Sequence, residues 1–566
     1  MWMPELPPFV PFLVAALLAL VTRGRLRAAL MLATPILGGV HLWLDVHPGT
    51  VVAVPLLEFE LVLLRVDRLS LLFGYLFHIA ATFAFLFALH VRDTTQCVAG
   101  LLYAGSALGA VFAGDLVTLF IFWELLAFSS TFLIWARRSA RARAAGMRYL
   151  LVQVTSGLLL LAGVLVHYRQ SGTLEFGLIG LAGSGGWLIF IAFGIKCAFP
   201  LLHNWLIDAY PEATPTGTVF LSAFTTKVAV YALARGFPGT ELLIYIGAVM
   251  TCFPIFYAVI ENDLRRVLAY SMINQLGFMV CGVGIGTALA LNGAVAHAFN
   301  DVIFKGLLFM SMGAVLFRTG RMNGSDLGGM YKSMPKTALL CSIGAASISA
   351  FPLFSGFVSK SLIMSAMLEQ GHEVLWLALL FASAGVFHHA GIKIPYFAFF
   401  ARDAGIRTAE APGNMLLAMG LAAVLCICIG CQPQYLYALL PWDVDYWPYE
   451  TSHVLAQLQL LCWAALAFVW LNKQGIYPPE LRAVNLDADW LYRRLLPAGG
   501  RRVFVSLRHA RQVLAGVGRF YRRSVLNAYC RTSLANFHLE DFWPTGSMVL
   551  WIAVVLGAYL LLDTVF

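Results

Sequence analysis

The sequence has 566 residues, of which 60% are hydrophobic and only 12% are Asp, Glu, Lys or Arg. A soluble domain carries about 25% charged residues, so this composition excludes a water-soluble enzyme and favours a chain whose apolar faces contact lipid. The formal net charge is +9, but Lys and Arg lie mainly in short segments between apolar runs. The charge therefore predicts membrane orientation, and we expect no nucleic-acid partner.

Sixteen mostly apolar stretches follow one another along the chain, and each is read as a membrane-spanning helix. They cover residues 8–22, 29–44, 69–90, 97–113, 116–136, 145–167, 186–206, 214–235, 241–260, 267–287, 290–317, 337–366, 373–400, 413–439, 452–472 and 546–563. The first lacks the basic flank of a cleaved signal, so we expect it to remain as a helix. The fold class is an all-α polytopic membrane protein with about 14–16 transmembrane helices.

Between the second and third stretches, the segment LEFELVLLRVDRLS alternates polar and apolar residues. This period of two predicts a short hairpin outside the membrane.

Loop charges predict the orientation. Arg and Lys concentrate in alternate loops, around residues 23–27, 137–143, 265–266, 318–336 and 402–407. The opposite loops are poor in both, and one of them, PWDVDYWPYE, is acidic. Because basic loops stay in the cytoplasm, this pattern predicts that both chain ends lie outside.

The stretch 473–545 breaks the pattern of spans. It holds many arginines, and apolar residues recur at helical spacing through Val503, Leu507, Val513, Val517 and Tyr521. This predicts a basic amphipathic helix along the cytoplasmic face; a disordered basic linker is the alternative. The predicted divisions are N-terminal helices 1–113, a first repeat 114–236, a second repeat 237–401, further helices 402–475, a lateral helix 476–545 and a terminal anchor 546–566.

Ionisable residues recur at or near mid-span. A charge at that depth costs about 2.5–3.5 kcal/mol and marks a functional candidate. The residues are Glu124, Lys196, Lys227, His297, Lys305, Lys360 and Lys393. Any one of them could be a structural pair, and Lys393, near a predicted helix end, could snorkel to the surface. Together, a carboxylate, several lysines and a histidine predict a proton relay.

The spacing of these residues adds detail. His297 and Lys305 are eight residues apart, so they project from similar faces of one helix. Pro200 follows Lys196, and Pro352 precedes Lys360. A lysine beside an interrupted helix, occurring in both halves, predicts two inverted repeats with discontinuous helices.

Cofactor chemistry is not indicated. Cys426, Cys428 and Cys431 lie in an apolar segment with no nearby His or acid, and we interpret them as helix residues, not metal ligands. The sequence contains no Walker loop and no dinucleotide fingerprint. We therefore expect no cofactor, no metal and no covalent chemistry.

Several long motifs carry a family resemblance over roughly residues 60–475. They are FWELLAFSSTFLI, GIKCAFPLLHNWLIDAYPEATPTGTVFLSAFTTKVAVYALAR, DLRRVLAYSMINQLGFM, AHAFNDVIFKGLLFMSMGAV and FPLFSGFVSK. They resemble the antiporter-like, proton-pumping subunits of respiratory complex I, and still more the D-type subunit of Mrp-type multi-subunit Na+/H+ antiporters. The run HHAGIKIPYFAFFARDAGIR favours the latter. In length, residues 473–566 are more similar to the lateral helix and anchor of the largest complex I antiporter-like subunit.

The resemblance implies roles for the buried residues. Glu124 would pair with Lys196, and Lys227 would be the lysine of the next helix. His297 and Lys305 would belong to a central polar axis.

Two further residues take roles beside the interrupted helices. Lys360 would be the lysine of the second broken helix, and His203 matches the family histidine after the first break. Lys393 completes the predicted ion pathway. His388 and His389 remain open between a helix-surface position and a proton role.

The resemblance implies a subunit of a monovalent cation (Na+)/proton antiporter, working beside a homologous large subunit and small multi-span subunits in a bacterial inner membrane. Alternatives are a proton-pumping subunit of a redox-driven complex and a subunit of an energy-coupled inorganic carbon uptake complex. A purely structural scaffold is disfavoured, because it would not need so many buried charges.

Overall fold

The computed structural model describes residues 6–534 and 545–565, apart from 57, 444 and 484. The chain divides into two compact units, Met1–Asp487 and Ala488–Phe566. Among the described residues, twelve helices are long and apolar enough to cross a membrane, and three further apolar helices are shorter. The predicted all-α polytopic membrane fold is confirmed.

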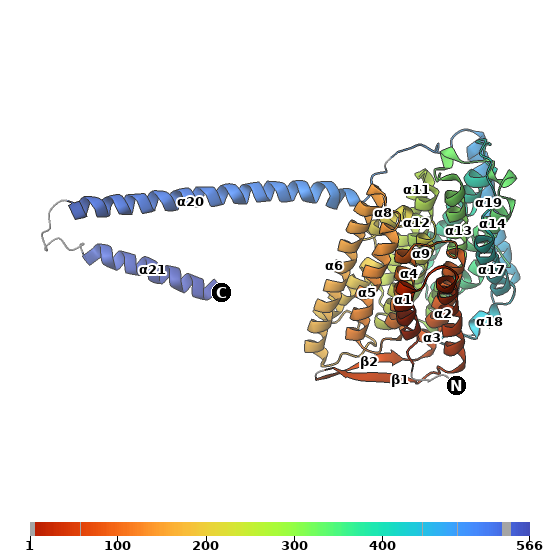
Figure 1. The fold of residues 1–566 in the computed structure, drawn as a ribbon, viewed down its shortest axis with the longest axis horizontal. Helices are drawn as coiled ribbons and strands as arrows, with labels where there is room; N and C mark the ends of the chain where they lie inside the picture. The colour runs from red at the N-terminus through yellow and green to blue at the C-terminus, as the bar shows by residue number, and fades with distance from the viewer. Residues whose placement is uncertain (1–5, 57, 444, 484, 535–544, 566) are drawn as a thin grey trace. The chain divides into compact units, whose positions relative to one another are not determined.

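The N-terminal part of the first unit contains helices and one β hairpin, which lies at one end of the bundle (Figure 1). Its elements are α1 (Val10–Val21), α2 (Gly24–Leu44), β1 (Val51–Leu56), β2 (Phe59–Arg65) and α3 (Arg68–Phe87). β1 and β2 are antiparallel, with Val51 opposite Arg65. The predicted hairpin is confirmed, although β1 precedes the alternating stretch that predicted it.

Two sets of helices follow. The first consists of α4 (Thr94–Phe112), α5 (Leu116–Trp135), α6 (Ala140–Ser171), α7 (Ser184–Lys196), α8 (Asn204–Ala209), η1 (Tyr210–Glu212), α9 (Gly217–Ala223) and α10 (Thr225–Gly236). The second consists of α11 (Leu242–Ile260), α12 (Leu264–Ile285), α13 (Ala288–Thr319), η2 (Gly324–Asp326), η3 (Met330–Lys332), α14 (Pro335–Ile348), α15 (Ser355–Glu369), α16 (Glu373–Val386), η4 (Phe387–Lys393) and η5 (Tyr396–Phe400). The elements η4 and η5 are π-helical.

The two sets use the same local signals at matching positions. α6 and α13 are both 32 residues long, and α13 begins 148 residues after α6, at 288 against 140. Each follows a hydroxyl cap, Ser139 or Thr287, whose side chain accepts a hydrogen bond from the backbone three residues on. Each ends at a left-handed glycine, Gly172 or Gly320. The chain therefore contains an internal repeat.

The repeats are inverted because each contains an odd number of crossings. In the first set, α4, α5, α6, the broken helix α7–α8 and the pair α9–α10 make five passes through the bundle. The second set has the same five. An odd number of passes starts the second repeat on the opposite side, which is the inverted arrangement typical of transporters.

Both broken helices carry Ala-Phe-Pro-Leu at the break, residues 198–201 in one repeat and 350–353 in the other. In each copy the alanine and the leucine adopt positive φ, between 57° and 72°, a region that such residues rarely populate. The proline also has no backbone donor. The chain leaves helical geometry at the same tetrapeptide in both repeats and frees carbonyls for other partners.

The first unit ends with α17 (Gly413–Cys431), α18 (Pro433–Tyr437) and α19 (Thr451–Lys473). The second unit contains the π-helix η6 (Leu491–Leu495), α20 (Leu496–Leu534) and α21 (Thr545–Val565). α20 is the long basic helix that the sequence predicts, and the alternative of a disordered linker is wrong for its residues. Part of the range predicted for it, residues 476–483 and 485–487, is non-helical and belongs to the first unit.

Close packing of α13 against α15 gives a test of this fold. A Cβ at Gly293 would lie 2.9 Å from the backbone nitrogen of Ile363, whereas a Cβ at Gly306 of the same helix would meet nothing within 4 Å. We expect Gly293→Ala to lower stability by about 1–3 kcal/mol through overpacking. Gly306→Ala should raise it by up to about 1 kcal/mol through helix propensity. Thermal unfolding of the purified protein in detergent measures both, and equal behaviour of the two variants would contradict this packing.

Candidate functional site

Ionisable side chains gather in the interior of the first unit, although burial of a charge in a membrane protein is costly. Each group therefore needs hydrogen bonds or an opposite charge. Seven of the sequence-predicted residues are almost wholly buried, at 3% exposure or less: Lys196, His203, Lys227, His297, Lys305, Lys360 and Lys393. We call these side chains the buried axis.

An ion pair between Lys227 of α10 and Asp301 of α13 forms the centre. The lysine Nζ lies 2.6 Å from Oδ2 of the aspartate, and both side chains are fully buried. Lys227 also donates to the carbonyl oxygen of Ser222 at 3.2 Å. The sequence analysis did not select Asp301, although its position four residues from both His297 and Lys305 was a readable signal.

α13 directs His297 and Lys305 toward the same neighbour, α12. Lys305 donates to Oγ of Ser271 at 2.8 Å, and Nε2 of His297 lies 3.0 Å from Oε1 of Gln275, one turn further along. The prediction that these two side chains share a face of their helix is confirmed. Nδ1 of His297 lies 2.9 Å from Oγ of Ser359 in α15. Hydroxyl groups both donate and accept hydrogen bonds, so these contacts can relay protons between helices.

Lys360 lies just after the second break. It donates to the carbonyl oxygen of Ile348, the last residue of α14, at 3.0 Å, and it lies 5.1 Å from the centre of the Phe278 ring. A cavity of about 490 Å³ between α15, α16 and α19 is lined in part by Lys360, His453 and Gln457. The cavity reaches the Lys360 side chain, so this end of the axis adjoins a space inside the bundle.

Lys196 makes a different contact from the expected one. Its Nζ donates to the carbonyl oxygen of Trp123 at 2.6 Å and lies 4.5 Å from the centre of the Trp123 ring. Among the described ion pairs there is none between Lys196 and Glu124, because the Glu124 carboxylate lies against Gly157 of α6. The two charges still interact through space, so the predicted pairing is indirect.

Lys393 is buried at the end of η4, so the alternative that it snorkels to the surface is wrong. Its Nζ lies 2.8 Å from Oε1 of Glu480 and donates to the carbonyl oxygens of Val259 and Glu261 at 2.6 and 2.7 Å. Burial raises the pKa of Glu480, and the Lys393 charge opposes that shift. The carboxyl group therefore holds a proton more readily than an exposed glutamate does.

His389 lies one turn before Lys393 in the π-helix η4, and its side chain is wholly buried. The charges of both Lys305 and Lys393 act on its ring. The sequence left this histidine open between a helix surface and a proton role, and its burial excludes the surface position. π-Helices recur at functional sites, and this one contains both the buried imidazole of His389 and the buried amine of Lys393.

His203 stands at the N-terminus of α8, after the first break. Its Nε2 lies 3.2 Å from Oδ1 of Asp487, with both side chains buried. The hydroxyl of Tyr270 donates to the other oxygen of the same carboxylate at 2.8 Å. Asp487 was not selected from the sequence, because 284 residues separate it from His203.

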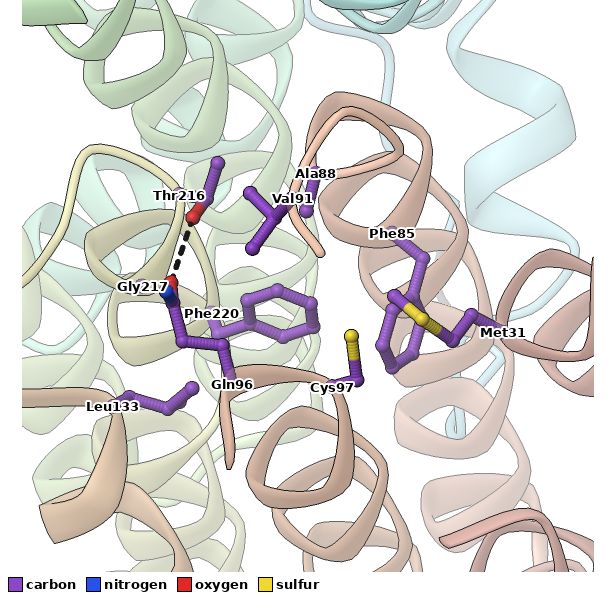
Figure 2. A pocket seen from close by; sticks show the side chains of 10 residues that line it. All are labelled: Met31, Phe85, Ala88, Val91, Gln96, Cys97, Leu133, Thr216, Gly217 and Phe220. Carbon is purple, nitrogen blue, oxygen red and sulfur yellow. Dashed lines mark hydrogen bonds between the residues drawn. The ribbon is translucent and has the colours of Figure 1, made fainter. Parts of the chain in front are cut away.

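A small pocket away from the axis is shown in Figure 2. It lies among α2, α3, α4, α5 and α9, and mostly apolar side chains line it. Its polar feature is a hydrogen bond of 3.2 Å, in which Thr216 donates to Gln96. No residue of the buried axis lines this pocket, so we do not assign the candidate function to it.

Inverted repeats, two broken helices and a buried row of bases and carboxylates define an ion- or proton-translocating membrane protein. The chain belongs to the NADH:quinone oxidoreductase/Mrp antiporter transmembrane family, whose profile matches residues 113–385. The D-type subunit of the Na(+)/H(+) antiporter of Alkalihalophilus pseudofirmus is 30% identical over 358 residues, which cover 58% of this chain and 72% of that protein.

Two further comparisons extend the similarity. Hydrogenase-4 component B of Escherichia coli (strain K12) is 28% identical over 491 residues, which cover 75% of this chain and 72% of that protein. A chain of the Mrp complex from Dietzia sp. DQ12-45-1b matches with a TM-score of 0.77 at 24% identity, over 96% of this chain and 64% of that chain. The structural match shows a shared fold.

The contact between Glu124 and Gly157 gives a test that separates the site from the fold. A Cβ at Gly157 would lie 1.4 Å from Oε1 of Glu124, so Gly157→Ala must displace that flexible side chain. We expect proton transport to fall at least as far as in Glu124→Gln, while assembly and thermal stability change little. Transport assays and thermal unfolding of the same preparations check this, and wild-type transport by Gly157→Ala would mean that the carboxylate position is unimportant.

Proposed function

We propose that this chain carries protons along the buried axis as one subunit of a multi-subunit complex in a bacterial inner membrane. The exchange would be for Na+ or another monovalent cation, beside a homologous large subunit and small multi-span subunits, with no cofactor of its own. It is a transporter subunit and not an enzyme. The observation that carries the proposal is the fully buried ion pair between Lys227 and Asp301.

Asp301 supports a mechanism because several bases share it. It pairs directly with Lys227, and its charge also acts on Lys305 and Lys360. One carboxylate can pair closely with only one lysine at a time, because Coulomb attraction falls with distance. Movement of the Asp301 carboxylate from one lysine to another therefore determines which lysine releases a proton. In this way a local rearrangement gives the proton transfer a direction.

Hydration of the axis supports the same proposal. Buried polar atoms with no hydrogen-bond partner in the described part of the chain include both side-chain atoms of Gln153, Oδ1 of Asn300 and both ring nitrogens of His389. Buried polar atoms are nearly always hydrogen-bonded, and water is the usual partner where protein supplies none. Water between these groups would complete the path between the bases and the cavity beside Lys360.

A second candidate is the proton-pumping subunit of a redox-driven complex. The observation that favours it is the extent of similarity: the hydrogenase-4 component aligns with 75% of this chain, against 58% for the D-type antiporter subunit. The same axis would serve both functions, so the source of energy distinguishes them. In this alternative, partner subunits would supply the electron chemistry.

The test of the proposed function uses inverted membrane vesicles that carry the whole complex, with Na+-dependent dequenching of a pH-gradient dye as the readout. We expect exchange in the wild type and loss of it in Asp301→Asn, Lys227→Met and Glu124→Gln. Removal of one partner from a buried ion pair costs about 3–5 kcal/mol, so the first two variants should also assemble less well. The double variant Lys227→Met/Asp301→Asn should regain assembly without regaining exchange.

Asp443 provides a matched control, because its side chain is 95% exposed in a pair with Arg68. Asp443→Asn makes the same chemical change outside the axis and should exchange normally. Full exchange in assembled complexes of Asp301→Asn would show that the buried pair is structural. If the wild type shows no exchange with Na+ but pumps protons when an electron donor is added, the redox-driven candidate is favoured.

A further inference from the structure

The described residues of the segment that follows α19, 474–483 and 485–487, form a non-helical strap across the first unit. We call it the C-terminal strap. Its described side chains make contacts with residues from four distant parts of the chain. These contacts are Glu480 with Lys393, Arg482 with Asp326, Asn485 with Glu261, and Asp487 with both His203 and Tyr270.

Two of these contacts differ in kind from the others. Glu480 and Asp487 are carboxylates with only 6% and 7% of their side chains exposed, and each meets a buried base of the axis. Arg482, in contrast, is 72% exposed in its pair with Asp326. Exposed pairs of that kind contribute little energy. Glu480 and Asp487 thus supply the axis with carboxylates from a segment outside the membrane-spanning helices.

The strap lies at one end of the bundle. Glu261 belongs to the connection between α11 and α12, and Asp326 to the connection between α13 and α14. Both connections carry the basic residues that the sequence analysis assigns to the cytoplasmic side, such as Arg266 and Arg321. The two carboxylates are therefore at the end of the axis where protons enter from, or leave to, the cytoplasm.

We propose that Glu480 and Asp487 are proton-transfer groups of the pathway, through which the strap connects Lys393 and His203 to the cytoplasmic water. This inference rests on the proposed function. The carboxylate of Asp487 accepts a proton from water at that face, and Nε2 of His203 takes it, which leaves the carboxylate ionised beside an imidazolium. One proton enters from the water and one passes to the histidine, so only O–H and N–H bonds break and form. At Lys393 the transfer runs outward: the ammonium gives a proton to the ionised Glu480 carboxylate, which releases it to the water and is left ionised beside the neutral amine.

The hydroxyl of Tyr270 fits this role. It donates to Oδ2 of Asp487 at 2.8 Å, while Nε2 of His203 approaches Oδ1 at 3.2 Å. The tyrosine therefore fixes the carboxylate against the histidine, whose Nε2 lies 3.2 and 3.4 Å from its two oxygens. A purely mechanical anchor would need no such orientation, and a neutral amide would hold the strap equally well. That difference makes the amide variants decisive.

The experiment uses purified whole complex in proteoliposomes, with a pH-sensitive dye inside and either a Na+ gradient or an electron donor as the driving force. The variants are Asp487→Asn and Glu480→Gln, which keep shape and hydrogen bonding, and Asp487→Glu, which keeps the acid. Arg482→Gln is the matched control, because it removes a strap contact without touching the axis. We expect the amide variants to slow proton transfer about tenfold or more, and the glutamate variant and the control to stay near the wild-type rate.

Chemical rescue separates proton transfer from anchoring. A small weak acid such as azide should restore the rate of the amide variants, because it carries protons to the vacated position, after correction for its effect on the wild type and on Arg482→Gln. A wild-type rate in an amide variant removes that carboxylate from the pathway. If azide does not restore proton transfer in the amide variants and Arg482→Gln is equally slow, the strap serves only as an anchor and does not transfer protons.

The wild-type complex separates the two levels of the proposal. If it moves no protons with either driving force, the proposed function fails, and the inference that rests on it fails as well. If the wild type is active while both amide variants are also fully active, only the inference about the strap fails.

Discussion

Burial of charged amines inside a membrane-spanning bundle is the constraint on which the rest of this structure depends. Such charges are tolerated only with close partners, and four of the buried lysines find one in the main chain. Their carbonyl acceptors belong to Trp123, Ser222, Ile348, Val259 and Glu261. Most of these residues stand at or beside the ends of helices, where carbonyls lack an intrahelical partner. The ends of helices thus provide the acceptors for Lys227, Lys360 and Lys393, whereas Lys196 uses a carbonyl within α5.

Carbonyls alone do not neutralise an ammonium, so the supply of carboxylates decides how the axis behaves. Asp301 is surrounded by several lysines and forms an ion pair with one of them. Glu124 interacts with its lysine only through space. The remaining acid groups, Glu480 and Asp487, come from the C-terminal strap. The axis is therefore rich in bases at its centre and depends on carboxylates from a non-helical segment at one end.

The sequence predicts those features that depend on local chemistry. Hydropathy locates the spans, and a lysine within an apolar run is visible whatever its partner, as for Lys227 and Lys305. Asp301 was predictable in the same way, because it lies on the same helix face as His297 and Lys305, which the sequence indicates. Asp487 was not predictable in this way. Its partner His203 is 284 residues away, and nothing in the sequence of a solvent-facing segment distinguishes a carboxylate that folds inward. Contacts across such distances depend on tertiary packing, which residue spacing does not encode.

The internal repeat explains how one scaffold came to hold opposite charges. Gly157 and Lys305 stand 148 residues apart, as do Trp123 and Ser271, which is the spacing of the repeats. In the first repeat, the seam between α5 and α6 uses the glycine to admit the Glu124 carboxylate. In the second, the same seam between α12 and α13 holds the lysine, bonded to the serine. Different residues at these matched positions thus leave room for the Glu124 carboxylate in the first repeat and place the Lys305 base in the second.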